Sequence, residues 1–238
     1  MSRFANLVKP RRLALIPARG GSIGLPGKNL ASVGGASLTA RVVRCAIETG
    51  LFDYILLSTD DALIADEGRR HGAQVPWLRS PELASDTAAV LDTVRDSLCR
   101  LQEAGLPSFD VVVLLEPTSP LRTVEIVKRT VAAAESDGVD AALSVSAVPV
   151  HYHPRKQFKL DTEGFATLFE TGRGPVVNRQ ELDRTFIRNG MCYVTRTTAL
   201  AAGAGIFGTR LRTVLVSGPV VNIDAPEDLA LARQILEP

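Results

Sequence analysis

A glycine-rich loop carrying two cations follows the first apolar run of the chain. Residues 13–29 read LALIPARGGSIGLPGKN, with Arg19 and Lys28 near the ends of the loop. Glycine lets backbone N–H groups approach a ligand closely, and successive N–H groups form a nest that binds anions. With two cations added, the loop predicts a binding site for a triphosphate. A structural turn is the alternative, because Gly, Pro and Asn are also turn residues.

The spacing within this loop departs from two common nucleotide-binding patterns. In the hydrolase pattern GxxxxGK[ST], Gly21 and Gly27 are one residue too far apart, and Asn29 stands where Ser or Thr would hold magnesium. The run from Gly21 to Gly24 also breaks the dinucleotide fingerprint GxGxxG. The loop therefore indicates phosphate binding of another kind.

Short apolar runs alternate with helix-like runs, and these elements must position the loop. Strands are predicted at 13–17, 54–58, 111–115, 141–145, 191–195 and 211–216. Helices are predicted at 38–48, 62–71, 88–101, 125–135, 197–202 and 225–236, with Asp224 near the N-cap of the last. This alternation indicates βαβ units, and nearly all-apolar strands indicate a parallel sheet covered on both faces. The prediction is an α/β fold, a three-layer doubly wound and mostly parallel sheet in one domain, 1–238.

The composition and charge of the chain argue against several classes of protein. The 238 residues are 45% hydrophobic, and the net charge of +1 gives no electrostatic case for nucleic-acid binding. No apolar run reaches membrane-spanning length, and the first ten residues lack the apolar segment of a signal peptide. Cys45, Cys99 and Cys192 lack CxxC spacing, which argues against zinc and fits a reducing compartment. We therefore expect a cytoplasmic protein with no membrane or nucleic-acid partner.

Six segments in order resemble the CMP-sialic acid synthetase family, the cytidylyltransferases that activate acidic nine-carbon sugars. The loop is similar to the family's PARGGSKGIPGKN, although Ile23 replaces its usual lysine. The other five are spread along nearly the whole chain: STDDALIAD (58–66), RSPELASDTA (79–88), LLEPTSPLR (114–122), NRQELDRTFIRNGMCYV (178–194) and NIDAPEDL (222–229).

The resemblance implies a Rossmann-like nucleotide-diphospho-sugar transferase fold and a reaction. CTP and a 2-keto-3-deoxy acidic sugar would give the CMP-sugar and pyrophosphate. Arg19, Lys28 and Asp224 would be catalytic. The implied nucleotide-binding residues are Ala18, Arg19, Gly20, Gly21, Ser22, Lys28, Asn29, Arg79 and Asp86, with the N–H groups of residues 20–22 on the phosphates.

A magnesium ion is implied, but its carboxylates differ from the family pattern. The family usually has two aspartates spaced one apart, where this chain has Asn222 and Asp224. Glu116 stands where glutamine is usual. One hypothesis is that Glu116 supplies the charge that Asn222 lacks. The alternatives are that Glu116 faces the acceptor while Asp224 alone anchors Mg²⁺, or that Asp224 only caps its helix and activity is weak.

The acceptor side is implied by the same comparison. The residues expected to bind substrate are Glu116, Thr118, Ser119, Lys156, Arg179, Gln180 and Asn189. Ile187 and Arg188 replace a more common Arg-Glu pair, so the pocket can differ from one for N-acetylneuraminate. Legionaminic acid, pseudaminic acid, a Kdo-like sugar or a phosphonate are therefore candidates.

Residues 151–180 are predicted to leave the sheet as a hairpin-like arm. The segment combines proline, basic residues and short two-period alternation. It resembles the arm through which family members pair, which implies a homodimer whose arms cover the acceptor pockets. A nucleotide-binding protein without turnover, or a transferase for another base, remains a competing hypothesis.

Overall fold

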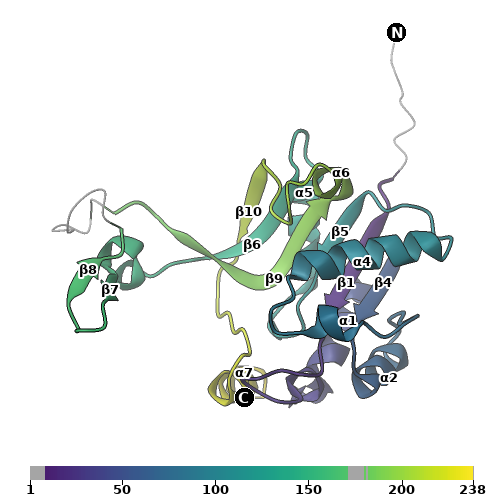
Figure 1. Cartoon of the computed structure of the whole chain (residues 1–238), viewed down its shortest axis with the longest axis horizontal. Coiled ribbons are helices and arrows are strands. Elements are labelled where there is room, and N and C mark those ends of the chain that lie inside the picture. The colour runs from purple at the N-terminus through teal and green to yellow at the C-terminus, as the bar shows by residue number, and fades with distance from the viewer. Residues whose placement is uncertain (1–8, 171–179, 181, 238) are drawn as a thin grey trace, which may run out of the picture.

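A mixed but mostly parallel sheet forms the centre of the molecule. The computed structural model describes residues 9–170, 180 and 182–237. Within these residues the main sheet has six strands in the order β10-β6-β9-β5-β1-β4, and only β9 runs antiparallel to its neighbours (Figure 1). Its strands are β1 (Arg12–Pro17), β4 (Tyr54–Ser58), β5 (Val111–Leu114), β6 (Ala141–Ala147), β9 (Phe186–Arg196) and β10 (Leu211–Leu215). The predicted mostly parallel α/β sheet is confirmed.

Helices cover both faces of this sheet and make three layers. Alternate residues of β1 face opposite sides: Ala14 and Ile16 pack with α1, α2 and α5, whereas Leu13 and Leu15 pack with α4 and α6. Both sets are fully buried, as expected for a central parallel strand. The α-helices are α1 (Leu38–Thr49), α2 (Ala62–Arg70), α3 (Pro81–Ala84), α4 (Val90–Glu103), α5 (Val124–Ala134), α6 (Thr197–Ala201) and α7 (Pro226–Leu236).

Local side chains set several helix starts. The hydroxyl of Ser37 accepts the N–H of Ala40 at α1, and the carboxylate of Asp61 accepts two N–H groups at α2. At α7 the N-cap is Ala225, and Asp228 accepts the N–H groups of Asp224 and Ala225. Asp224 therefore lies just before the cap, and its carboxylate is left for other contacts. The hypothesis that Asp224 only caps this helix is wrong.

The long strand β9 connects the body to a projecting arm. Its last part pairs with β5 and β6, and its first part pairs with β6 alone, from Phe186 to Arg188. The β6–β9 register shifts between Leu143 and Val145, where a bulge bends the pair. β6 and β9 thus leave the sheet together as a two-stranded stem (Figure 1).

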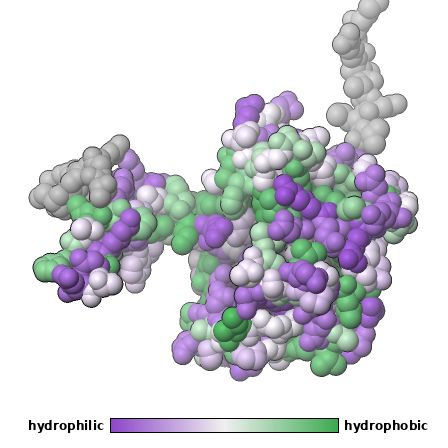
Figure 2. Space-filling view, viewed as in Figure 1, coloured by the Kyte–Doolittle hydropathy of each residue, from purple (hydrophilic) through white to green (hydrophobic). Residues whose placement is uncertain are grey.

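The arm at the end of this stem contains the predicted hairpin. Two 3₁₀ turns, η2 (Val150–Tyr152) and η3 (Pro154–Lys156), precede the antiparallel pair β7 (Phe158–Leu160) and β8 (Ala166–Leu168). Figure 2 shows hydrophobic side chains on the arm and its stem. The large exposed apolar residues of the arm are Tyr152, Phe158, Leu160, Phe165 and Phe169.

Short elements were not predicted from the sequence. They are the 3₁₀ turn η1 (Lys28–Leu30), the pair β2 (Ser32–Val33) and β3 (Ala36–Ser37), and α3. Elements of two to four residues are too short to show a helix or strand period. Among the described residues, none of the helices has both the length and the apolar character needed to cross a membrane.

Candidate active site

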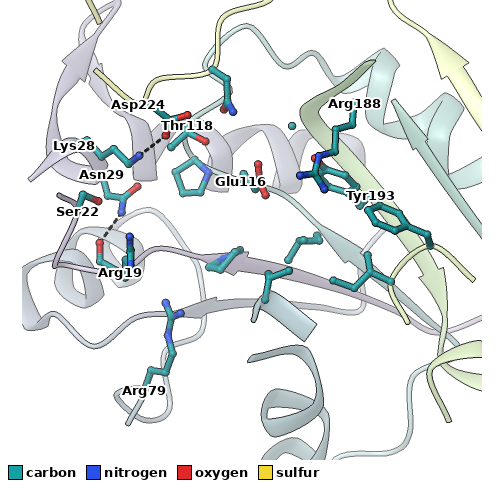
Figure 3. A pocket seen from close by; sticks show the side chains of 18 residues that line it. Arg19, Ser22, Lys28, Asn29, Arg79, Glu116, Thr118, Arg188, Tyr193 and Asp224 are labelled. Carbon is teal, nitrogen blue, oxygen red and sulfur yellow. Dashed lines mark hydrogen bonds and ion pairs between the residues drawn. The ribbon is translucent and has the colours of Figure 1, made fainter. Parts of the chain in front are cut away.

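A cleft of about 490 Å³ opens at the carboxyl ends of β1 and β5. Crevices at this edge are the usual binding sites of open α/β sheets. The structure brings nine predicted site residues to its lining (Figure 3): Arg19, Ser22, Lys28, Asn29, Arg79, Glu116, Thr118, Asn222 and Asp224. They come from segments up to two hundred residues apart, so the predicted convergence occurs.

The glycine-rich loop is held by side chains that follow β4. Arg19 pairs with Asp86 at 2.5 Å, and the N–H of Gly20 donates to Asp60 Oδ1 at 3.0 Å. The N–H of Ser22 donates to the carbonyl of Gly20 at 3.1 Å. The structure thus differs from the expected nest, because the N–H groups of Gly20 and Ser22 are already donated within the protein. Asp86 contacts the site through Arg19 rather than lining the cleft.

Lys28 joins the loop to the segment before α7. Its Nζ donates to Asp224 Oδ1 at 2.8 Å and to the carbonyl of Ile223 at 3.1 Å. Gly24 brings the two segments closer still, since a Cβ at this position would lie 2.4 Å from the carbonyl oxygen of Asp224. These contacts place a cation and a carboxylate side by side on the cleft wall.

Among the described residues, two buried polar atoms beside the glycine-rich loop have no hydrogen-bond partner. Arg79 is only 8% exposed; its Nη2 donates to the carbonyl of Ser58 at 2.7 Å, but its Nε has no partner. Burial lowers the pKa of Arg79, against the opposing effect of nearby Asp60. The amide of Asn29 donates to the carbonyl of Arg19 at 2.8 Å while its Oδ1 has no partner. An anionic ligand with hydrogen-bond donors would satisfy both groups.

Three oxygen-bearing side chains lie close together opposite Gly190. A Cβ at Gly190 would lie 2.8 Å from Ser119 Oγ, 3.0 Å from Glu116 Oε2 and 3.3 Å from Asn222 Oδ1, and the φ of +73° also favours glycine. Burial raises the pKa of Glu116, although Arg122 and Arg188 oppose the shift. In the described chain no group of three or more His, Cys, Asp or Glu could hold a metal ion. Oxygen donors of this kind suit a divalent cation that takes its other ligands from substrate phosphates and water.

Arg122 supports this wall from behind. Its guanidinium is buried and donates Nε–H to the carbonyl of Met191 and Nη2–H to the carbonyl of Glu116. Burial lowers its pKa. The side chain thereby ties the end of β5 to β9, a role that the sequence did not reveal.

Several predicted acceptor residues support the cleft without lining it. Ser119 and Asn189 are buried, and Ser119 Oγ lies 3.5 Å from the carbonyl of Asn189 and 3.5 Å from Asn222 Oδ1. Lys156 and Gln180 are exposed and absent from the cleft lining. Ala18 is buried, with its N–H donated to Ser58, and Gly21 does not line the cleft. Arg179 lies outside the described residues.

The far end of the cleft is lined by Arg188, which the sequence marked only as a departure from the family pattern, and by two residues that it did not single out. Arg188, Tyr193 and Phe207 line the cleft there (Figure 3). Burial, with the nearby Glu116, raises the pKa of Tyr193 to about 12, so its hydroxyl stays protonated. Alternation along one strand could not have brought Tyr193 and Phe207 together, because Tyr193 lies on β9 whereas Phe207 lies in the turn that follows α6.

Comparisons with known proteins agree on one kind of chemistry. The Cytidylyltransferase family model matches residues 13–212. CMP-N,N'-diacetyllegionaminic acid synthase of Legionella pneumophila is 33% identical over 229 residues, which cover 95% of this chain and 97% of the relative. An N-acylneuraminate cytidylyltransferase of Streptococcus agalactiae is 32% identical over 83% of this chain and 46% of the relative. CMP:2-keto-3-deoxy-manno-octonic acid synthetase complexed with CTP has the same fold, with a TM-score of 0.70 at 18% identity over 95% of this chain and 98% of that one.

Proposed function

This chain belongs to the cytidylyltransferase family, and from that premise we propose that it transfers CMP from CTP to the anomeric hydroxyl of a 2-keto-3-deoxy acidic sugar. Pyrophosphate is the second product. The observation that carries the proposal is the convergence of Arg19, Lys28 and Arg79 on one cleft with a facing set of oxygen ligands.

The cleft residues fit an in-line displacement at phosphorus. The sugar hydroxyl attacks the α-phosphorus, the bond to the β-phosphate oxygen breaks, and the anomeric C–O bond is retained. Arg79 and Lys28 stabilise the charge on the phosphates, because preorganised cations need no rearrangement as charge develops. Asn29 Oδ1, which lacks a partner, would accept a hydrogen bond from the ribose or base. Thr118 lines the cleft near Lys28 and Asp224 (Figure 3).

The metal that fits this site is Mg²⁺. Cytidylyltransferases of this kind generally use a divalent metal ion. Asp224, Asn222 and Glu116 offer hard oxygen donors, and the metal would neutralise phosphate charge. Binding of the metal to Asp224 would compete with the 2.8 Å pair to Lys28, which would leave Lys28 free for the triphosphate.

Replacing Glu116 with Gln is expected to raise the Mg²⁺ concentration for half-maximal rate by about tenfold, because one negative charge leaves the metal site. The measurement is the rate of pyrophosphate release against Mg²⁺ concentration at saturating CTP. Glu48→Gln, at an exposed position on α1, is the matched control. An unchanged magnesium curve would show that Glu116 faces the acceptor and that Asp224 alone anchors the metal.

Pyrophosphate release with CTP and Mg²⁺ across a panel of acids tests the function. The panel is N-acetylneuraminate, legionaminate, pseudaminate, Kdo and deaminated neuraminate. Release with at least one acid is expected. If none reacts while CTP binds, the second candidates apply: a phosphonate acceptor, or a nucleotide-binding relative without turnover. Ile23 and Asn222 motivate the latter. Replacing CTP with other nucleoside triphosphates tests the base.

We further propose that the protein is a homodimer joined through its arms. Phe158, Leu160 and Phe165 are 61%, 71% and 68% exposed. Apolar surface of this kind is favourably buried in an interface. In such a dimer, Lys156, Arg179 and Gln180 of one arm would reach the acceptor pocket of the other subunit.

We also propose a cytoplasmic location. It is favoured by CTP as the substrate and by the free cysteines found throughout the described residues.

Light scattering is expected to give twice the 25.5 kDa mass of the chain at micromolar concentration. Phe165→Glu should weaken the dimer by about tenfold or more, because it places a charge in an apolar contact. Leu63→Glu is the control, since Leu63 is also 68% exposed but lies on α2. A monomeric wild-type protein would contradict the proposal.

A further inference from the structure

The cations of the cleft lie in two separate places. Arg19, Lys28 and Arg79 lie on the nucleotide side, whereas Arg188 lies at the other end, beyond Glu116 (Figure 3). Arg19 and Lys28 are paired with Asp86 and Asp224. In contrast, no hydrogen bond or ion pair is found for the guanidinium of Arg188 within the part of the chain that is described. It is a cleft cation with its charge available to a ligand.

The backbone around Arg188 is held firmly although its side chain is exposed. Arg188 pairs with Val145 of β6 at the bulge, and the next two residues, Asn189 and Gly190, are buried. Asn189 Oδ1 accepts the hydroxyl of Ser144 at 2.6 Å. The strand therefore presents Arg188 from a fixed position, as a binding residue needs.

The neighbours of Arg188 make its charge necessary for an acidic ligand. Glu116, Arg188 and Tyr193 line the same cleft, and Arg188 lies between the other two in the view of Figure 3. An acidic acceptor that entered beside Glu116 would meet a like charge. A guanidinium at this place removes that repulsion and offers two parallel N–H groups to a carboxylate.

We infer that Arg188 binds the carboxylate of the acceptor and so determines which acids this chain uses. The inference rests on the proposed function. In a 2-keto acid sugar the carboxylate is attached to the carbon that bears the attacking hydroxyl, so a cation that holds one group also orients the other. If Arg188 only neutralised Glu116, its contribution to acceptor binding would be the same for a charged and an uncharged acceptor.

The test compares Arg188→Gln with wild type on the best acid of the panel and on its carboxamide analogue. We expect Arg188→Gln to raise the KM for the acid by about ten- to hundredfold. The KM for CTP should stay within about threefold, as one lost contact on the acceptor side predicts. On wild type, the KM for the carboxamide should exceed the KM for the acid by a similar factor. On the variant, the two KM values should be nearly equal, because both changes remove the same contact.

Two further variants sharpen the comparison. Arg188→Lys should recover part of the affinity, and Arg212→Gln, an exposed arginine on β10, should behave as wild type. The inference would be overturned if Arg188→Gln raised the KM for the acid and the KM for the carboxamide by the same factor relative to wild type. That result would mean that the residue acts only through Glu116. An unchanged KM for the acid would overturn it as well.

Calorimetry separates this inference from the proposed function. Each acid of the panel is titrated into wild type and Arg188→Gln, with both proteins saturated with CTP in the absence of added metal. Weaker binding to the variant, even without turnover, supports the carboxylate contact while the transfer reaction fails. Equal binding overturns the role of Arg188, and no binding to wild type overturns it together with an acidic sugar as the acceptor.

Discussion

Replacing Asp224 with Asn is expected to lower kcat for pyrophosphate release by about a hundred- to a thousandfold, the range typical of lost electrostatic stabilisation at a reacting phosphate. Asparagine keeps the shape but removes the only full charge among the residues of the 222–224 segment that face the cleft. The measurement is the rate at saturating CTP, acid and Mg²⁺.

Folding should be nearly unaffected by this substitution. The carboxylate of Asp224 is 70% exposed, and exposed ion pairs contribute little to stability. Asp66→Asn provides a control at an exposed aspartate of α2. If Asp224→Asn kept a third or more of the wild-type kcat, Asp224 would not be a metal ligand, and the site would have to be assigned to Glu116.

Replacing Arg122 with Met is expected to destabilise the protein by about 3 kcal/mol or more, because two buried carbonyls lose a charged donor. The carbonyls belong to Glu116 and Met191. Their segments form the wall that carries Glu116, so kcat should also fall in whatever fraction remains folded. Urea unfolding followed by circular dichroism measures the first effect.

A substitution of a surface arginine is the control for this loss of stability. Arg212→Gln on β10 should change the free energy of unfolding by less than about 0.5 kcal/mol. Arg122→Lys should lie between wild type and Arg122→Met, because one ammonium cannot serve two carbonyls in the fork geometry of a guanidinium. A loss below about 1 kcal/mol in Arg122→Met would contradict the role of Arg122 as a tie between β5 and β9.

The layers of the fold were predictable because burial leaves a strong pattern. Strands such as β1 and β5 are apolar on both faces, and amphipathic helices of nine or more residues separate most of them. The direction and length of β9 were not predictable. Phe186 to Arg188 lie outside the apolar run, and they join the strand only because β6 bends at its bulge to pair with them.

The site was predictable where it lies on strand ends and loops with a distinctive composition. Arg19, Lys28 and Asp224 belong to segments whose glycines, cations and carboxylates indicate phosphate chemistry. Arg122 gave no such signal, and Arg188 stood out only as a departure from the family pattern. The function of Arg122 depends in part on the carbonyl of Met191, 69 residues away, and that of Arg188 on its place at the mouth of the arm.

β9 lies between β5 and β6 in the sheet, but it is one of the last strands of the chain to be synthesised. β9 ends at Arg196, and residues 148–185 precede it after β6 has been made. On the ribosome, β4, β1 and β5 can assemble early, but β6 has no neighbour until β9 emerges. During that interval the edges of β5 and β6 are open to pairing with other nascent chains. Shortened chains that end within the arm are therefore prone to aggregation, and efficient production depends on how quickly β9 closes the sheet.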